Sequence, residues 1–350
     1  MSDIDSAPAA EAHDNRRLDV TAVGNALVDV LARTTDAEID RLGLIKGSMA
    51  LIDLLQSTTV YEAMGSTVEV SGGSAANTVA GVAALGARAG YIGKVADDQF
   101  GTVFLHDITA TGVEMGRTSP VPASDAPGDE RATGHCLILV TEDGERTMST
   151  HLGVAGTLGP EDLDEDLLAR SQIVYLEGYM WDQPPAKAAL RRAVEVAHAA
   201  DALVALTLSD PFCVTRHRRE FLALLHGEID VLFANEEEVT LLFDMSNFDG
   251  AVAAVEETGV LGALTRGAAG SVVVTASGPQ AVAAEPVDHV VDTTGAGDLY
   301  AAGFLYGLTQ GYDPEHCARL GGLCAGEVIS HFGARPQADL KKLVSEAGIF

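Results

Sequence analysis

"VVDTTGAGDLYAAGF", the stretch from Val290 to Phe304, places a short glycine turn between Asp292 and Asp298, where an apolar helix begins. A strand is expected to end at Val290–Val291, and Leu299–Leu308 has the small and apolar composition of a buried helix. Asp298 could simply cap that helix. Alternatively, backbone N–H groups of the turn could bind an anion at the helix N-terminus, with Asp298 acting as a base beside it. The stretch alone leaves both interpretations open.

Length, composition and charge limit the classes of protein to which the chain can belong. The chain has 350 residues, of which 47% are hydrophobic and 37 are glycine, and this composition is typical of a folded α/β protein. A formal net charge of −29 and a pI near 4.5 argue against nucleic acid or an anionic membrane as partners. An anionic substrate would therefore need a metal ion or a helix N-terminus beside it.

The cysteines and the N-terminus bear on the cellular location. Cys136, Cys213, Cys317 and Cys324 form no CxxC pair and no zinc-ligand spacing, which indicates a reduced, cytoplasmic protein without a metal cluster. Residues 1–17 are polar and lack the apolar core of a signal peptide, so they are predicted to form a disordered tail. No apolar run is long enough to span a membrane.

The order of apolar and helical segments predicts an α/β fold. From Leu158 onward, nearly continuous apolar strands alternate with helical stretches, which indicates a doubly wound parallel sheet with helices on both faces. Two runs joined by "EDGE" predict a hairpin. We expect one domain over residues 18–350, in which segments of about 31–70 and 117–154 form a small β-rich lid.

Four segments follow predicted strands, where ligand contacts belong in such a fold. They are "GNALVD" (24–29), "SGGSAAN" (71–77), "ANEEEV" (234–239) and the stretch around Asp298. Each has a structural alternative: the glycine pair could be a plain helix start, and Asn235 with Glu238 could form a capping box. No Walker A loop, Rossmann fingerprint or nucleophile elbow is present.

Taken in order, these segments resemble the ribokinase family, the phosphofructokinase-B family of sugar and nucleoside kinases. The resemblance runs from about Leu18 to Pro336 and includes "GYIGKVADDQFG" (90–101) and "TRGAAG" (265–270). It implies a ribokinase-like fold, a homodimer or monomer, and a small-molecule acceptor with ATP as phosphoryl donor. A ligand-binding relative without catalysis is disfavoured by the intact Asp298 and glycine turn, and a dinucleotide-dependent oxidoreductase by the missing Rossmann fingerprint.

The resemblance also implies the catalytic groups. Asp298 would accept the proton of a substrate hydroxyl as that hydroxyl attacks the γ-phosphoryl group of ATP. Backbone N–H groups of Gly295, Ala296 and Gly297 would stabilise the charge that develops there. Arg146, on the hairpin, would reach toward the phosphates or the acceptor.

Further site residues follow from the same resemblance. The acceptor is expected to contact Asn25, Asp29, Gly72, Gly73, Ser74, Asn77, Cys136, Met148, Leu152, Tyr179 and Phe212. ATP is expected to contact Asn235, Thr265, Gly267, Gly270, Cys324 and Ala325. Glu238 would hold Mg²⁺ through water, and Asp292 and Thr294 would hold a monovalent cation such as K⁺.

Within the family, "GNALVD" and "LTLSDPF" (206–212) are similar to segments of adenosine kinases. Apolar side chains among the acceptor residues could form a slot for a flat purine. We therefore expect phosphorylation of a nucleoside at its 5′-hydroxyl, adenosine to AMP in purine salvage. The alternative is a ribokinase-like sugar kinase acting on ribose, fructose or 2-keto-3-deoxygluconate. Met49 and Ala76 replace polar residues of mammalian-type adenosine kinases, which predicts relaxed base selectivity.

Overall fold

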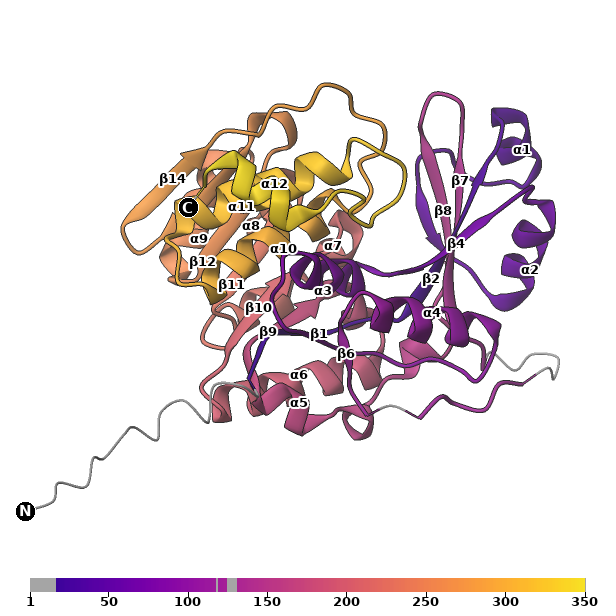
Figure 1. Cartoon of the computed structure of the whole chain (residues 1–350), viewed down its shortest axis with the longest axis horizontal. Coiled ribbons are helices and arrows are strands. Elements are labelled where there is room, and N and C mark those ends of the chain that lie inside the picture. The colour runs from indigo at the N-terminus through magenta and orange to yellow at the C-terminus, as the bar shows by residue number, and fades with distance from the viewer. Residues whose placement is uncertain (1–16, 118, 125–130, 350) are drawn as a thin grey trace, which may run out of the picture.

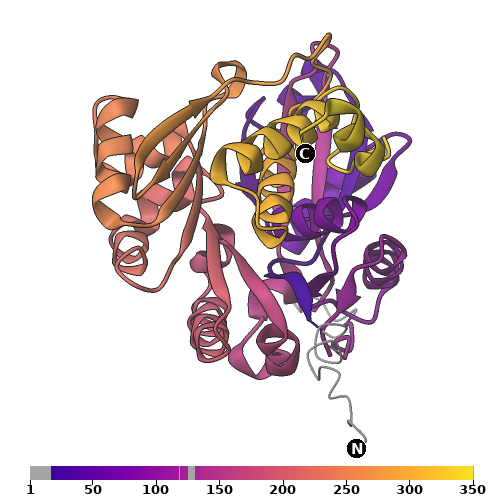
Figure 2. The ribbon, with the colours of Figure 1, turned by 60° about the vertical axis from the view of Figure 1, so that its left-hand side comes forward.

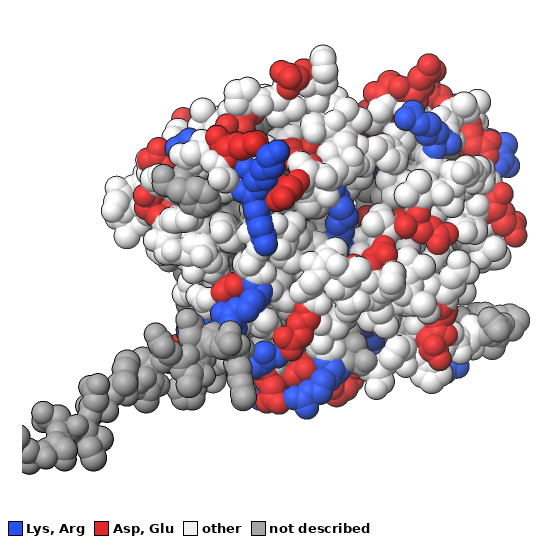
Figure 3. All heavy atoms as spheres, in the orientation of Figure 1, with Lys and Arg blue, Asp and Glu red and all other residues white. Residues whose placement is uncertain are grey.

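The computed structural model describes residues 17–117, 119–124 and 131–349, and these form two β-sheets with associated helices (Figures 1 and 2). The tail predicted for residues 1–17 lies outside the described residues except for Arg17. Within the described ranges, no helix combines the length and the apolar character needed to cross a membrane. Acidic side chains occur over several parts of the face drawn in Figure 3, in line with the net charge of −29.

The larger sheet has nine strands in the order β14-β13-β12-β11-β10-β9-β1-β5-β6. Its parallel strands are β1 (Leu18–Val23), β5 (Ala89–Ile92), β6 (Glu114–Met115), β9 (Ser171–Glu177), β10 (Leu203–Thr207), β11 (Val231–Asn235) and β12 (Leu261–Thr265). At one edge, β13 (Ser271–Thr275) and β14 (Gly278–Val282) run antiparallel. The connection from β12 to β13 is too short for a crossover helix, so this strand pair can only be antiparallel.

Helices cover both faces of this sheet, as the alternating strand and helix segments predicted (Figures 1 and 2). One face packs against α3 (Ser74–Ala84), α4 (Gln99–Ala110), α10 (Ala296–Thr309), α11 (Pro314–Val328) and α12 (Leu340–Ala347). The other face packs against α5 (Glu165–Ala169), α6 (Pro184–Ala199), α7 (Pro211–Leu224), α8 (Glu236–Phe243) and α9 (Phe248–Thr258). Along β9, Tyr175 belongs to the first core, whereas Val174 and Leu176 belong to the second. The predicted doubly wound fold is therefore confirmed.

The smaller sheet has the strand order β3-β8-β7-β2-β4 and lies to one side in Figure 1. Its strands are β2 (Leu27–Arg33), β3 (Met49–Leu51), β4 (Val68–Gly72), β7 (Gly134–Val140) and β8 (Arg146–His151), accompanied by α1 (Asp36–Arg41) and α2 (Leu54–Ala63). The predicted hairpin is confirmed, because β7 and β8 pair antiparallel. We call this sheet, with its two helices, the lid sheet.

One local prediction was wrong. Val290–Val291 is an exposed loop and not a strand, because the backbone N–H of Val291 bonds to Ile329 at the end of α11 instead of a neighbouring strand. Helix α7 begins at Pro211, where Asp210 caps it. Proline at the first helical position after an aspartate cap is a strong start signal.

Candidate active site

A cleft of about 810 Å³ lies between the carboxyl ends of the large sheet's strands and the lid sheet. Strand β1 has β5 on one side and β9 on the other, so the strand order reverses there, where ligands bind in doubly wound folds. A volume of this size suits small molecules. The predicted residues that line the cleft are Asn25, Asp29, Gly73, Ser74, Asn77, Cys136, Arg146, Met148, Leu152, Tyr179, Asn235, Glu238, Thr265, Gly267, Thr294, Gly295, Ala296, Gly297 and Asp298.

Asp298 lies in the first turn of α10 and is held by two side chains of α3. Ser74 Oγ donates to Oδ1 at 2.7 Å, and Asn77 Nδ2 donates to Oδ2 at 3.0 Å. Burial raises the pKa of Asp298, while the hydrogen bonds from Ser74 and Asn77 and the charge of Arg335 oppose that rise. The carboxylate is therefore fixed in orientation and faces the cleft.

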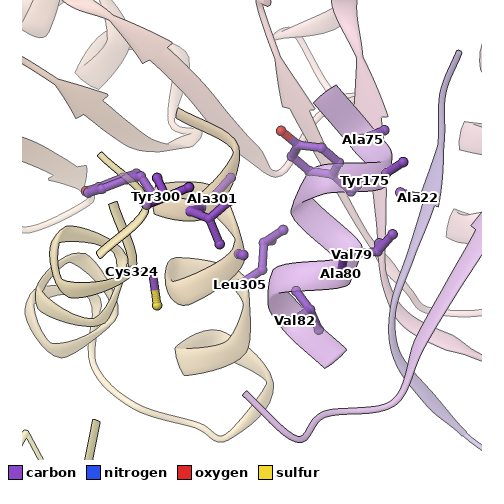
Figure 4. Packing of buried hydrophobic residues seen from close by; sticks show 14 of the residues in the cluster. Ala22, Ala75, Val79, Ala80, Val82, Tyr175, Tyr300, Ala301, Leu305 and Cys324 are labelled. Atoms are coloured by element: carbon purple, nitrogen blue, oxygen red, sulfur yellow. The ribbon is translucent and has the colours of Figure 1, made fainter. Parts of the chain in front are cut away.

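Close packing of α3 on α10 brings these groups together (Figure 4). A Cβ added to Gly81 would lie 2.7 Å from the Cβ of Ala302 and equally close to Leu299, so only glycine permits this approach. Figure 4 shows Leu305 of α10 pointing toward α3. The helix pair thus positions Ser74 and Asn77 beside Asp298.

Gly295 precedes α10 and adopts left-handed backbone geometry, with φ of 75°. A Cβ at Gly295 would lie 2.8 Å from the Cβ of Ala334, so a side chain would displace the turn. The N–H of Ala296 bonds back to Thr293 at 3.2 Å, whereas the next N–H groups of the helix have no intrahelical partner. The turn is shaped to present N–H groups and the positive end of the helix dipole to the cleft.

Asp29 lies on β2, and Gly72 on β4 makes room for it. A Cβ on Gly72 would lie 2.2 Å from Cγ of Asp29, so any larger residue would displace the carboxylate. Burial raises the pKa of Asp29 to about 7, although the charges of Arg335 and Arg146 act in the opposite direction.

Glu177, the last residue of β9, is a site residue that we did not predict. Its Oε1 accepts hydrogen bonds from the backbone N–H (2.8 Å) and side-chain amide (2.7 Å) of Asn25, and its Oε2 accepts one from the N–H of Ala75 (3.0 Å). Burial raises its pKa to about 7 despite these bonds. Glu177 therefore joins the end of β1 to the start of α3. An acid ending an otherwise apolar strand was the available sequence signal.

Arg335 is a second site residue that we did not predict. It lies in the loop between α11 and α12 and donates hydrogen bonds to the backbone oxygens of Ser71 and Ala76. It therefore connects the C-terminal part of the chain to the turn between β4 and α3.

Arg146 and Asp292, assigned separately from the sequence, form an ion pair. Asp292 also accepts hydrogen bonds from the backbone N–H groups of Thr294 (3.0 Å) and Gly333 (2.7 Å). Thr294 thus contributes a backbone N–H donor to Asp292. The positive charge beside the Asp292 carboxylate is the guanidinium group of Arg146, on strand β8 of the lid sheet. A monovalent-cation site at Asp292 and Thr294 stays a prediction.

Asn235 and Glu238 form the capping box of α8 and also line the cleft. Glu238 accepts hydrogen bonds from the backbone N–H of Asn235 at 2.9 Å and from its side-chain amide at 2.8 Å. Burial raises the pKa of Glu238 to about 7. Asn235 and Glu238 therefore cap α8 and can still contact a ligand in the cleft. No cluster of three or more His, Cys, Asp or Glu side chains suited to a metal ion occurs in the described part of the chain.

Some predicted site residues lie outside the cleft lining. Phe212 is 68% exposed, and Cys324 is fully buried in the core, with Ala325 beside it on α11 (Figure 4). Gly270 shapes the turn between β12 and β13, where a Cβ would lie 2.1 Å from the backbone oxygen of Val282. Gly72 lies against Asp29, and Asp292 forms an ion pair with Arg146, so both residues contact the cleft lining without being part of it.

Known proteins share this architecture over nearly the whole chain. A probable sugar kinase from Rhizobium etli CFN 42 is 43% identical, with a TM-score of 0.90, over 96% of this chain and 100% of that chain. The adenosine kinase from Sinorhizobium meliloti is 47% identical, with a TM-score of 0.88, over 95% of this chain and 99% of that chain. The 5-dehydro-2-deoxygluconokinase of Shouchella clausii (strain KSM-K16) is 28% identical over 95% of this chain and 97% of its own length.

The family model of the pfkB family carbohydrate kinases matches residues 46–341, a range that contains the lid sheet's hairpin, the glycine turn and Asp298. The chain has a doubly wound fold with a cleft at the carboxyl ends of its strands. It belongs to the pfkB family of carbohydrate kinases.

Proposed function

We propose that this kinase phosphorylates a nucleoside at its 5′-hydroxyl, with adenosine as the preferred acceptor and ATP as the donor. The observation that carries the proposal is the apolar face that the lid sheet turns toward the cleft beside Asp29. A free sugar needs a carboxylate for its hydroxyls but no extended apolar surface, whereas a purine needs both.

Strand register defines this apolar face. Asp29 is opposite Cys136, Cys136 is opposite Thr150, and Thr150 is opposite Leu51, so one row crosses four strands. The neighbouring row contains Leu31, Ile138, Met148 and Met49. Since adjacent strands are about 4.8 Å apart, the face extends roughly 14 Å from Asp29. This length accommodates a base attached to a ribose whose hydroxyls bind Asp29.

The proposed chemistry follows from the positions of the chain's own groups. Asp298 accepts the proton of the acceptor hydroxyl as its oxygen bonds to the γ-phosphorus, and the bond to ADP breaks. The N–H groups at the start of α10 stabilise the charge on the phosphoryl oxygens. Ser74 and Asn77 keep Asp298 oriented, so that the rate gain comes from positioning and electrostatics.

The cleft lining also suits Mg²⁺ and the nucleotide. Asn235 and Glu238 bring oxygen atoms to the same cleft as Thr265 and Gly267, and Mg²⁺ prefers oxygen ligands while keeping several waters. We assign Glu238 to the hydrated Mg²⁺ and Thr265 and Gly267 to ATP. The metal would supply charge neutralisation of the phosphates, in a cleft where Arg146 is the one Lys or Arg among the described lining residues.

A sugar kinase is the second candidate. It is favoured by the names of the R. etli and S. clausii relatives and by the polar end of the cleft, where Asn25, Asp29 and Glu177 lie together. These side chains would bind sugar hydroxyls with or without an attached base.

Phosphoryl transfer should be measured with ATP and Mg²⁺ on adenosine, guanosine, cytidine, ribose, fructose, 2-keto-3-deoxygluconate and 5-dehydro-2-deoxygluconate. We expect the highest kcat/KM with adenosine. Met148→Gln should raise KM for adenosine and leave KM for a free sugar unchanged, because it places a polar amide in the base slot. A free sugar as the best acceptor, unaffected by Met148→Gln, would assign the enzyme to the sugar kinases.

Acceptor binding should weaken on acidification. The pKa of Asp29 is raised to about 7 by burial, so the carboxylate becomes protonated below that pH and loses its charge-assisted hydrogen bonds. KM for the acceptor should rise by about tenfold per pH unit below the pKa, while KM for ATP changes less. The measurement is KM against pH for the wild type and for Asp29→Asn, which should have a high KM without this dependence. A flat wild-type profile would contradict the role of Asp29.

A further inference from the structure

Arg335 holds the turn between β4 and α3 through all three nitrogens of its guanidinium group. Nε and Nη2 donate to the backbone oxygen of Ser71 at 3.0 and 2.8 Å, and Nη2 also contacts Ser71 Oγ at 3.1 Å. Nη1 donates to the backbone oxygen of Ala76 at 2.8 Å. These bonds connect residues 264 and 259 positions apart in the sequence. A fork with several donors in one plane is a feature of arginine that lysine lacks.

The turn that Arg335 holds carries groups that position both carboxylates of the proposed reaction. Gly72 provides the space for Asp29, and Ser74 and Asn77 donate hydrogen bonds to Asp298. A shift of Ser71 or Ala76 would therefore move the acceptor-binding carboxylate and the base together.

Arg335 is also a positive charge close to both carboxylates. Burial raises the pKa of Asp29 and of Asp298, and Arg335 is the positive group that opposes the rise at both. Burial lowers the pKa of Arg335 itself to about 10, so it remains protonated at neutral pH. The other ionisable groups that face Asp29 or Asp298 are Arg146 on β8, Cys136 on β7, Tyr175 and Glu177 on β9, and Tyr179 after β9.

We propose that Arg335 is a positioning residue for phosphoryl transfer, which fixes the turn between β4 and α3 and supplies a positive charge near both Asp29 and Asp298. The inference rests on the proposed roles of Asp29 and Asp298. Arg335 does not line the cleft, so it acts through these carboxylates and not on the substrate.

The first test is the pH profile of kcat/KM for the best acceptor in Arg335→Gln, Arg335→Lys and Ser71→Ala. Loss of the charge in Arg335→Gln should move the acid limb of the profile upward by about one pH unit. Arg335→Lys keeps the charge and should return the limb toward the wild-type position. Ser71→Ala removes one contact of Arg335 without changing charge, so its limb should match the wild type. Equal loss of activity at every pH in Arg335→Gln would show a purely structural role and overturn the proposal.

The second test needs no substrate and separates this proposal from the proposed function. Thermal unfolding at neutral pH is measured for Arg335→Gln, Asp29→Asn and the double variant. Because Arg335→Gln removes a counter-charge from buried Asp29 and Asp298, adding Asp29→Asn should restore part of the lost melting temperature. Additive losses would refute the charge role even if the enzyme used another acceptor. If Arg335→Gln alone does not fold, folding of the double variant supports the proposal and its failure to fold contradicts it.

Discussion

Replacing Asp298 with asparagine should lower kcat by about 1000-fold, the usual contribution of a well-placed general base. Asparagine has nearly the same shape and can still accept the hydrogen bond from Ser74 Oγ, so the helix pair should remain packed. It cannot take up the proton of the acceptor hydroxyl. The expected result is therefore a large loss of kcat with acceptor and ATP binding retained, measured by steady-state kinetics and by calorimetric titration of each ligand.

Asp313→Asn is the matched control for this variant. Asp313 caps α11 through a 3.0 Å hydrogen bond from the N–H of His316 and lies outside the cleft lining. Asparagine caps helices as well as aspartate does, so normal kcat is expected. If Asp298→Asn retained turnover close to that of Asp313→Asn, Asp298 would not be the base.

Gly295→Ala should lower kcat by about 100-fold, the lower end of what removal of a charge-stabilising donor costs. The backbone at Gly295 has φ of 75°, and an added Cβ would lie 2.8 Å from the Cβ of Ala334. The turn must therefore move, and its N–H groups then no longer point to the place where charge develops. Single-turnover kinetics with saturating ATP and acceptor would measure the loss in the chemical step.

Gly311→Ala separates backbone strain from the loss of geometry at the cleft. Gly311 follows the same helix, has φ of 76°, and has no atom within 4 Å of an added Cβ. Left-handed geometry alone should cost about 1 kcal/mol of stability. We therefore expect Gly311→Ala to melt at a lower temperature with unchanged kcat. Equal kcat losses in both glycine variants would show that the effect of Gly295→Ala is general destabilisation.

The ion pair between Arg146 and Asp292 gives the lid sheet a direct connection to the loop that leads into the glycine turn. The Arg146 side chain also lies over the ring of Phe332, 5.5 Å from its centroid, next to Gly333 in the loop that contacts Asp292. The position of β8 is therefore coupled to the segment immediately before Asp298. A residue assigned to catalysis and one assigned to a cation are, in this structure, partners of one another.

The sequence by itself determined the fold class and the residues whose role depends on local backbone geometry. Continuous apolar strands separated by helices can bury both faces only in a covered parallel sheet, so this pattern predicted the doubly wound body. The glycine turn at Gly295 and the position of Asp298 in the first helical turn follow from a few adjacent residues. These features depend on periodicity and on φ, both of which short stretches of sequence report.

Only the tertiary structure decided which distant side chains meet. The hydrogen bond from Asn77 to Asp298 spans 221 positions, that from Arg335 to Ser71 spans 264, and that from Ala75 to Glu177 spans 102. No local pattern distinguishes Arg335 from a surface arginine, or Cys324 in the core from a residue on a cleft wall. The physical reason is that hydrogen-bond partners and burial depend on how helices and strands pack, and the whole topology sets this packing. Helix propensity and hydrophobic periodicity, in contrast, act over only a few residues.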